Sequence, residues 1–281
     1  MTDPCAGIRF RTAGRLYYFS AIGFEDLALG DRVVVDTTRG LDLGWVAIAP
    51  DQVLGAQFDG LKPIRRRASW AELNELALLR TKESEALQVV RQRSASYDLP
   101  LKVVLVEYNF DGTRLTVYFV SDERRVDFRE LVRDLGRTFR TRVVMHQVGP
   151  RDQAKLVGGF DRCGRELCCS SWMTEFEPIS IRMAKTQRLP LNPSEISGVC
   201  GKLLCCLSFE DAQYRASQDG LPRVGARMTS AVGSGKVVDV NVLKRVITIQ
   251  WEGGNRVEVD ADELAEQQAR HTATFGGETA D

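Results

Sequence analysis

Short runs in which apolar and polar residues alternate fill the first part of the chain. They include the stretches GIRF, RLYYF and WVAIA, with glycines at the turns between them. Successive side chains of a strand point to opposite faces, so this alternation predicts strands with one buried face. We therefore expect a small, strongly bent β-domain over residues 1–66.

A long charged segment follows this domain and predicts a single helix. It runs from about Trp70 to Ser96 within residues 67–98, and Ser69 stands directly before it. Serine is a favoured N-cap because its hydroxyl accepts a hydrogen bond from a first-turn amide. The many Glu, Lys and Arg residues of the segment are typical of a solvated face.

The middle of the chain shows the order β-β-α-β. Two strand-like runs, LKVVLVEYNF and TRLTVYFV, are joined by Asp111-Gly112, which is a strong hairpin signal. The next apolar residues recur at helical spacing, with Asp127 as the expected N-cap of a capping box. A further strand, RVVMHQV, lies at 142–148. This order predicts a small sheet domain with a helix, over residues 99–220.

The last part of the chain consists of short strand-like runs separated by glycines. Over residues 221–267 this pattern resembles an SH3-like or Tudor-like small β-barrel, which is a statement about fold and not about function. Residues 268–281 are small and polar, and we expect them to form a disordered tail. The predicted fold class is therefore α+β.

Composition excludes several classes of protein. In 281 residues, 43% are hydrophobic, and 38 basic residues balance 38 acidic ones. Bulk charge therefore provides no general attraction to nucleic acid or to a membrane. The sequence contains neither a long apolar run nor an apolar N-terminal leader, so we expect a cytoplasmic protein without membrane insertion, in a reducing compartment.

Two copies of one cysteine motif are the strongest chemical signal. CGRELCC at 163–169 returns as CGKLLCC at 200–206, and together they hold six of the seven cysteines. Disulfides are disfavoured in a reducing compartment, and burial of cysteines as small apolar residues does not explain the repeated glycine, basic residue and leucine. We therefore expect a metal site, with these candidate ligands: Cys163, Cys168, Cys169, Cys200, Cys205 and Cys206.

The spacing of the thiols favours iron–sulfur over zinc. The gap between the first two cysteines of each motif is C-x4-C, which is closer to plant-type iron–sulfur spacing than to the usual zinc spacing. His146 and His271 both lie outside the motifs. Gly164 and Gly201 could supply the turn that brings the thiols of a motif together. Three prolines between the motifs exclude one continuous helix, so we also expect the two motifs to approach each other.

Arg129, Arg133 and Arg137 form one stripe on the predicted middle helix. They are either a solvated face or a contact with RNA or an acidic partner. The sequence contains no G-x-S-x-G, H-E-x-x-H or P-loop signature, so we expect no enzymatic activity.

The segments GIRFRTAGRLYYF, VDFRELVRDLGRTFRTRVVMHQV and LNPSEISGVCGKLLCCLSFE, with the double C-G-x-x-L-C-C pattern, resemble the RicT family, also called YaaT. The resemblance implies a non-enzymatic subunit of a regulatory complex that carries 4Fe–4S clusters on the six motif cysteines. It also implies YlbF-type and YmcA-type helical partners, assistance to ribonuclease Y in processing and turnover of messenger RNA, and roles in sporulation, competence and biofilm control. The alternatives are an iron–sulfur or dithiol redox enzyme and a zinc-stabilised nucleic-acid adaptor.

Overall fold

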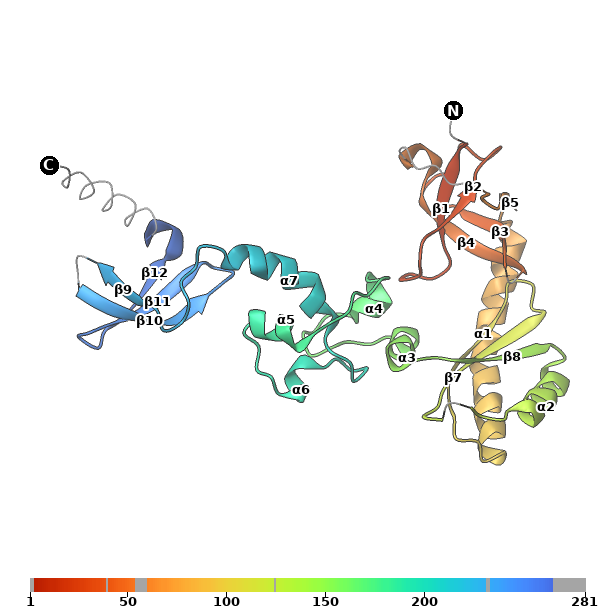
Figure 1. The fold of residues 1–281 in the computed structure, drawn as a ribbon. Helices are drawn as coiled ribbons and strands as arrows, with labels where there is room; N and C mark the ends of the chain where they lie inside the picture. Colours follow the sequence, from red (N-terminus) through yellow and green to blue (C-terminus); the bar gives the residue numbers. More distant parts are fainter. Residues whose placement is uncertain (1–2, 39, 54–59, 124, 231–232, 265–281) are drawn as a thin grey trace. The chain divides into compact units, whose positions relative to one another are not determined.

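The computed structural model describes residues 3–38, 40–53, 60–123, 125–230 and 233–264 (Figure 1). The chain is mixed α+β and forms two compact units. The first unit holds residues 1–176 and 197–202, and the second holds residues 177–196 and 203–281. The domain boundaries expected from the sequence stay predictions, and the expected tail at 268–281 lies outside the described residues.

The N-terminal part of the first unit is a five-stranded antiparallel sheet in the order β2-β1-β4-β3-β5. Its strands and the following 3-10 turn are β1 (Cys5–Arg9), β2 (Tyr17–Ser20), β3 (Arg32–Thr37), β4 (Gly40–Ile48), η1 (Pro50–Gln52) and β5 (Ile64–Arg67). The bend that the sequence predicts is present. The register shifts between Gly7 and Ile8 where β1 pairs with β4. At Gly44, an added Cβ would lie 2.5 Å from Ile8 Cγ2, so only glycine allows β1 to pack this closely on β4.

The single long helix is confirmed. α1 spans Trp70–Ser96, and Ser69 is its N-cap in a capping box with Glu72. The Glu72 N–H donates to Ser69 Oγ at 3.3 Å, and the Ser69 N–H donates to Glu72 Oε2 at 2.9 Å. This box satisfies two amide groups that would otherwise lack partners at the start of the helix.

The predicted β-β-α-β order is also confirmed. β6 (Lys102–Tyr108) and β7 (Arg114–Val120) form an antiparallel hairpin, and β8 (Arg142–Gln147) pairs with β7 in parallel. The parallel pairing needs a crossover, which α2 (Arg129–Phe139) supplies. Figure 1 shows α1 and α2 beside this sheet, and both helices bury residues in its core: Ala86, Val90, Val103, Val106, Leu115, Val117, Leu131, Leu135 and Val143.

The predicted N-cap of α2, Asp127, lies one residue before the observed one. Phe128 is the N-cap and makes no side-chain capping bond. The Asp127 carboxylate accepts from the Arg129 N–H at 3.2 Å and forms an ion pair with the Arg129 guanidinium at 2.6 Å. The Asp127 side chain thus still accepts from a first-turn amide, although the helix starts one residue later than expected.

Five helices follow, two of which begin at the vicinal cysteines, and the described part of the chain ends in a separate sheet. The helices are α3 (Pro150–Val157), α4 (Cys168–Ser171), α5 (Ile181–Thr186), α6 (Pro193–Ile196) and α7 (Cys205–Gln218). The C-terminal sheet is antiparallel, in the order β12-β11-β10-β9. Its strands are β9 (Arg227–Ser230), β10 (Gly233–Asn241), β11 (Val246–Trp251) and β12 (Arg256–Asp260). Closure of this sheet into an SH3-like barrel stays a prediction.

Candidate metal centre

The repeated sequence motif is also a repeated backbone loop. In the first copy, the Asp161 N–H donates to Arg165 O at 3.1 Å and the Gly164 N–H donates to Asp161 O at 2.9 Å. The Leu167 N–H then closes the loop on Gly159 O at 3.0 Å. These bonds form a tight turn directly at the first cysteine of the motif.

The second copy repeats each bond 37 residues later. The Gly198 N–H donates to Lys202 O, and the Gly201 N–H donates to Gly198 O, both at 2.9 Å. The Leu204 N–H donates to Ile196 O, also at 2.9 Å. The sequence repeat is therefore a structural repeat, which burial of isolated cysteines would not require.

The glycine after the first cysteine has the same special backbone in both loops. Gly164 has φ +73° and Gly201 has φ +72°, which lie in the left-handed region. An L residue with a Cβ is strained there, and glycine is not. The turn expected at these positions is confirmed.

The vicinal cysteines stand at the start of a helix in both loops. Leu167 has φ −54° and ψ 126° before α4, and Leu204 has φ −55° and ψ 130° before α7. Cys205 and Cys206 thus occupy the first turn of a helix of 14 residues. The amide groups of a first helical turn have no partners within the helix and favour negative charge, as on a thiolate.

A small core anchors the start of α7 in the second unit. Leu207 is fully buried with Ala184 of α5 and Ile196 of α6. The buried Gln187 side chain donates from Nε2 to Leu207 O at 2.7 Å. These contacts place the second vicinal pair on a rigid support, which a metal site needs.

The motif thiols differ in access to solvent. Cys163 is exposed and Cys169 is buried, while Cys168 and the three cysteines of the second motif are half-buried. Cys5 lies in β1, where burial raises the pKa of its thiol. Its position fits the expectation that Cys5 is not a ligand, because metals bind the thiolate.

The turn of the second loop belongs to the same compact unit as the whole first loop. That unit therefore holds Cys163, Cys168, Cys169 and Cys200, whereas Cys205 and Cys206 belong to the second unit. The Arg162 guanidinium donates to Ser197 O at 3.1 Å and joins the first loop to this turn. The expected approach of thiols from the two motifs to each other stays a prediction.

The donor set matches soft-metal chemistry. Thiolates are the ligands of iron–sulfur clusters and of many zinc sites. Across the part of the chain that the structure describes, no three His, Cys, Asp or Glu side chains are close enough together to hold a metal ion. The six cysteines suit such a group by chemistry, and their assignment as ligands stays a prediction.

The arginine stripe lies on the exposed side of α2. Arg129, Arg133 and Arg137 are all exposed, while Leu131 and Leu135 fill the opposite, buried side. The hydrogen bonds from Arg129 lower the pKa of the Asp127 carboxyl to about 2. One of the three positive charges is therefore already matched by a neighbouring carboxylate.

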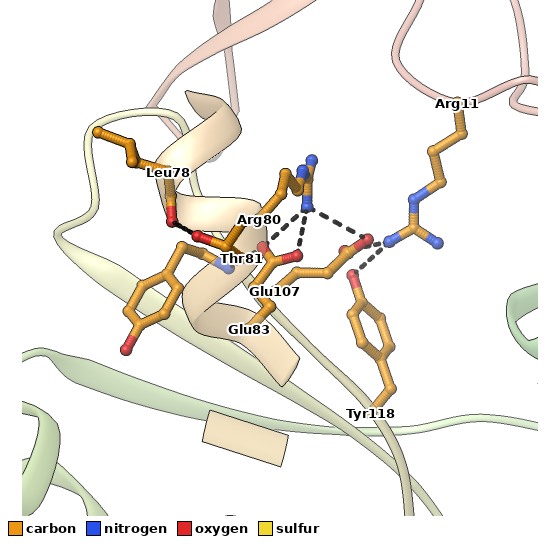
Figure 2. Close-up of polar contacts among 8 residues, drawn as sticks. Arg11, Leu78, Arg80, Thr81, Glu83, Glu107 and Tyr118 are labelled. Carbon is orange, nitrogen blue, oxygen red and sulfur yellow. Dashed lines mark hydrogen bonds and ion pairs between the residues drawn. The ribbon is translucent and has the colours of Figure 1, made fainter. Parts of the chain in front are cut away.

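Sequence reasoning missed a polar cluster in the first unit, which Figure 2 shows. Arg11, between β1 and β2, forms an ion pair with Glu107 of β6 and donates to Tyr118 Oη of β7 at 3.2 Å. Arg80 Nη1 of α1 lies 3.9 Å from Glu107 Oε1. The same nitrogen donates a hydrogen bond to Glu83 Oε1 at 2.8 Å. Members as far apart as residues 11 and 107 leave no local sequence signal.

Comparison with known proteins agrees with the expected family. Residues 62–148 match the PSP1 C-terminal conserved region, and residues 178–221 match the third domain of PSP1-like proteins. The second cysteine motif lies inside the latter match. Among the described residues, no helix is both long and apolar enough to cross a membrane.

Two relatives extend this match. The chain is 41% identical over 265 residues to the Stage 0 sporulation protein YaaT of Bacillus subtilis (strain 168), which covers 93% of this chain and 95% of that protein. It is 33% identical over 147 residues to an uncharacterised protein of Schizosaccharomyces pombe, which covers 42% of this chain and 20% of that protein. No solved structure matches the chain. Because the similarity to YaaT spans nearly the full length of both proteins, this chain belongs to the YaaT family, also called RicT.

Proposed function

We propose that this chain is a non-enzymatic iron–sulfur subunit of a regulatory complex. The observation that supports the proposal most is the duplicated loop, because two copies with the same hydrogen bonds each carry three thiols. Reuse of one loop geometry, down to a left-handed glycine, is expected where a ligand sets the requirement. The candidate ligands are the six motif cysteines.

The thiol chemistry favours a 4Fe–4S cluster, with zinc as the alternative. All six donors are sulfur, and the motifs contain no histidine. Such a cluster would supply a redox centre that can gain and lose an electron. The chain's own residues would place thiolates at two helix starts and leave Cys163 exposed.

Partner proteins are part of the proposal because six thiols in two triplets exceed one four-thiolate site and do not complete two such sites. A second chain could complete the ligand set, and the family resemblance suggests YlbF-type and YmcA-type helical proteins. It further suggests that the assembly assists ribonuclease Y in processing messenger RNA. The name of the Bacillus subtilis relative supports a regulatory role linked to sporulation.

A redox enzyme is the competing proposal. The sequence contains no flavin or nicotinamide fingerprint that would supply a second redox group. A vicinal dithiol that exchanges disulfides would require neither a second copy of the loop nor a third cysteine in each copy. A thiol–disulfide exchange assay on the purified chain separates the two, and turnover of a small disulfide would favour the enzyme.

Anaerobic purification followed by iron, sulfide and zinc analysis tests the metal. We expect a brown protein with broad absorption near ~400 nm, either alone or with partners, as thiolate-bound clusters give. The Cys168→Ser variant should lose iron because a hydroxyl is a poor ligand for a soft metal, and Cys5→Ser should retain it. Stoichiometric zinc without sulfide would contradict the cluster, and full iron in both variants would contradict the ligand assignment.

Contact with RNA or an acidic partner is proposed for the stripe on α2. Arg133 and Arg137 are exposed, whereas Arg129 is paired with Asp127. We expect Arg133→Glu or Arg137→Glu to weaken binding of single-stranded RNA more than Arg129→Glu does, with the difference shrinking as salt rises. Equal binding by all three variants and the parent chain would leave a solvated face.

A further inference from the structure

A cavity of about 640 Å³ in the first unit has no role in the proposal above. The turn between β1 and β2 forms one wall, and α1 with the β6–β7 hairpin forms another. Cavities that hold small ligands in proteins measure roughly 300–1,000 Å³. The volume therefore suits a ligand of mononucleotide size.

Two of the three acidic side chains that line the cavity are matched by arginines. Asp36 forms an ion pair with Arg65, and Glu107 forms ion pairs with Arg11 and Arg80. The polar cluster of Figure 2 thus neutralises its own charges on this wall.

The third acidic side chain is Asp42, whose pKa is raised by burial. Its carboxylate accepts a hydrogen bond from the Leu43 N–H at 2.9 Å. Arg80 and Arg114 lower the same pKa, so burial, which favours the neutral carboxyl, is what limits competition of Asp42 with an anionic ligand for Arg114.

Three cationic side chains of the same cavity remain available. Arg15 and Lys62 are exposed, and neither has an ion pair among the residues that the structure describes. Arg114 has a buried Nε atom that finds no hydrogen-bond acceptor there. An anionic oxygen that enters the cavity would form charge-assisted hydrogen bonds with these cationic side chains.

An aromatic surface lies beside these cations. Tyr17 is 50% exposed at the cavity, and the Phe10 ring supports it at 5.9 Å between ring centroids. Phe10 in turn packs edge-on against the buried Phe19 at 6.4 Å. A half-exposed ring on a fixed support is suited to stacking with a planar base.

We propose that this cavity binds a nucleoside phosphate, with the phosphate held by Arg15, Lys62 and Arg114 and the base stacked on Tyr17. Cations and an exposed aromatic ring in one cavity match the two halves of such a ligand. A simple inorganic anion would leave the aromatic wall unused. The ligand is either a free mononucleotide or the phosphorylated end of a single-stranded RNA, since both present the same chemistry.

Calorimetric titration of the full chain with four probes tests the proposal. The probes are adenosine 5′-monophosphate, adenosine, inorganic phosphate, and a 5′-phosphorylated oligoadenylate of about eight nucleotides. We expect the monophosphate to bind at least about tenfold more tightly than adenosine or phosphate alone, because each of these lacks one half of the contacts. Equal affinity for the oligoadenylate would assign the site to an RNA end, and binding of the monophosphate alone would assign it to a free nucleotide. Absence of binding by both nucleotide probes, or equal affinity of the monophosphate and phosphate, would overturn the proposal.

Exposed residues allow variants that leave the fold intact. The double variant Arg15→Glu, Lys62→Glu should bind the monophosphate at least about tenfold more weakly, and Tyr17→Ala should weaken the monophosphate but not phosphate. Lys82→Glu is the matched control, because Lys82 is exposed on α1 and does not line the cavity. Unchanged affinity in the double variant, or an equal loss in the control, would overturn the proposal.

Discussion

Replacing the left-handed glycine of either cysteine loop by alanine should make local opening of that loop more frequent and leave the other loop unchanged. Gly164 and Gly201 have φ +73° and +72°, and an added Cβ at either position meets no atom within 4 Å. Steric clash with neighbours therefore adds nothing, and only the backbone strain counts. That strain is about 1–2 kcal/mol for an L residue.

The strain should appear in the hydrogen bond that closes each loop. In the first loop the Leu167 N–H donates to Gly159 O, and in the second the Leu204 N–H donates to Ile196 O. If Gly164→Ala raises the free energy of the closed loop by 1–2 kcal/mol, local opening becomes roughly 5- to 30-fold more frequent. Amide hydrogen exchange at Leu167 should accelerate by that factor, because exchange follows local opening.

Each variant provides the control for the other. Gly201→Ala should accelerate exchange at Leu204 and leave Leu167 unchanged, since each loop is closed by its own hydrogen bonds. Gly253→Ala is a further control, because Gly253 is outside the left-handed region and its added Cβ also meets open space. Unchanged exchange at Leu167 in Gly164→Ala, or an equal acceleration in Gly253→Ala, would refute the reasoning.

Three further predictions concern stability, measured as the free energy of unfolding in urea. Ser69→Ala should cost about 1 kcal/mol by removing the capping box of α1, and helical circular dichroism should show fraying; no loss would mean that the cap is redundant. Leu135→Ala should cost about 2–5 kcal/mol because Leu135 is fully buried between α2 and the sheet, and a cost below ~1 kcal/mol would contradict that packing. Burial raises the pKa of Glu83 even though the Tyr108 N–H and Arg80 donate to it, so the folded chain holds this proton more tightly than the unfolded chain. Stability should therefore fall as pH rises through and above the ordinary glutamate pKa of about 4.3, and Glu83→Gln should remove that part of the fall; a parallel pH profile in the variant would contradict the sign.

Local patterns determined much of the secondary structure. Alternation predicted the N-terminal strands, Asp111-Gly112 predicted the β6–β7 hairpin, and Ser69 predicted the start of α1. These signals act over a few residues, so the sequence carries them without help from distant parts of the chain. The left-handed turns at Gly164 and Gly201 belong to the same class, because glycine alone adopts that backbone without strain.

The start of α2 was not predicted correctly from local sequence. The capping box expected at Asp127 did not form: Phe128 is the N-cap, and the Asp127 carboxylate binds the amide and the guanidinium of Arg129. Sequence spacing allows both arrangements, and their free energies differ by no more than a single hydrogen bond or exposed ion pair. Three-dimensional placement of both side chains decides between them.

The sequence by itself therefore determined that six cysteines form two copies of one loop, that a long capped helix joins two sheet regions, and which family the chain belongs to. Only the tertiary structure decided which distant residues meet. It brought Arg11 to Glu107 and Tyr118, paired β7 in parallel with β8, and left the cations of Arg15, Lys62 and Arg114 around one cavity. Such contacts depend on how whole elements pack, because the free energy gained by burying their apolar faces sets their positions and the polar side chains follow.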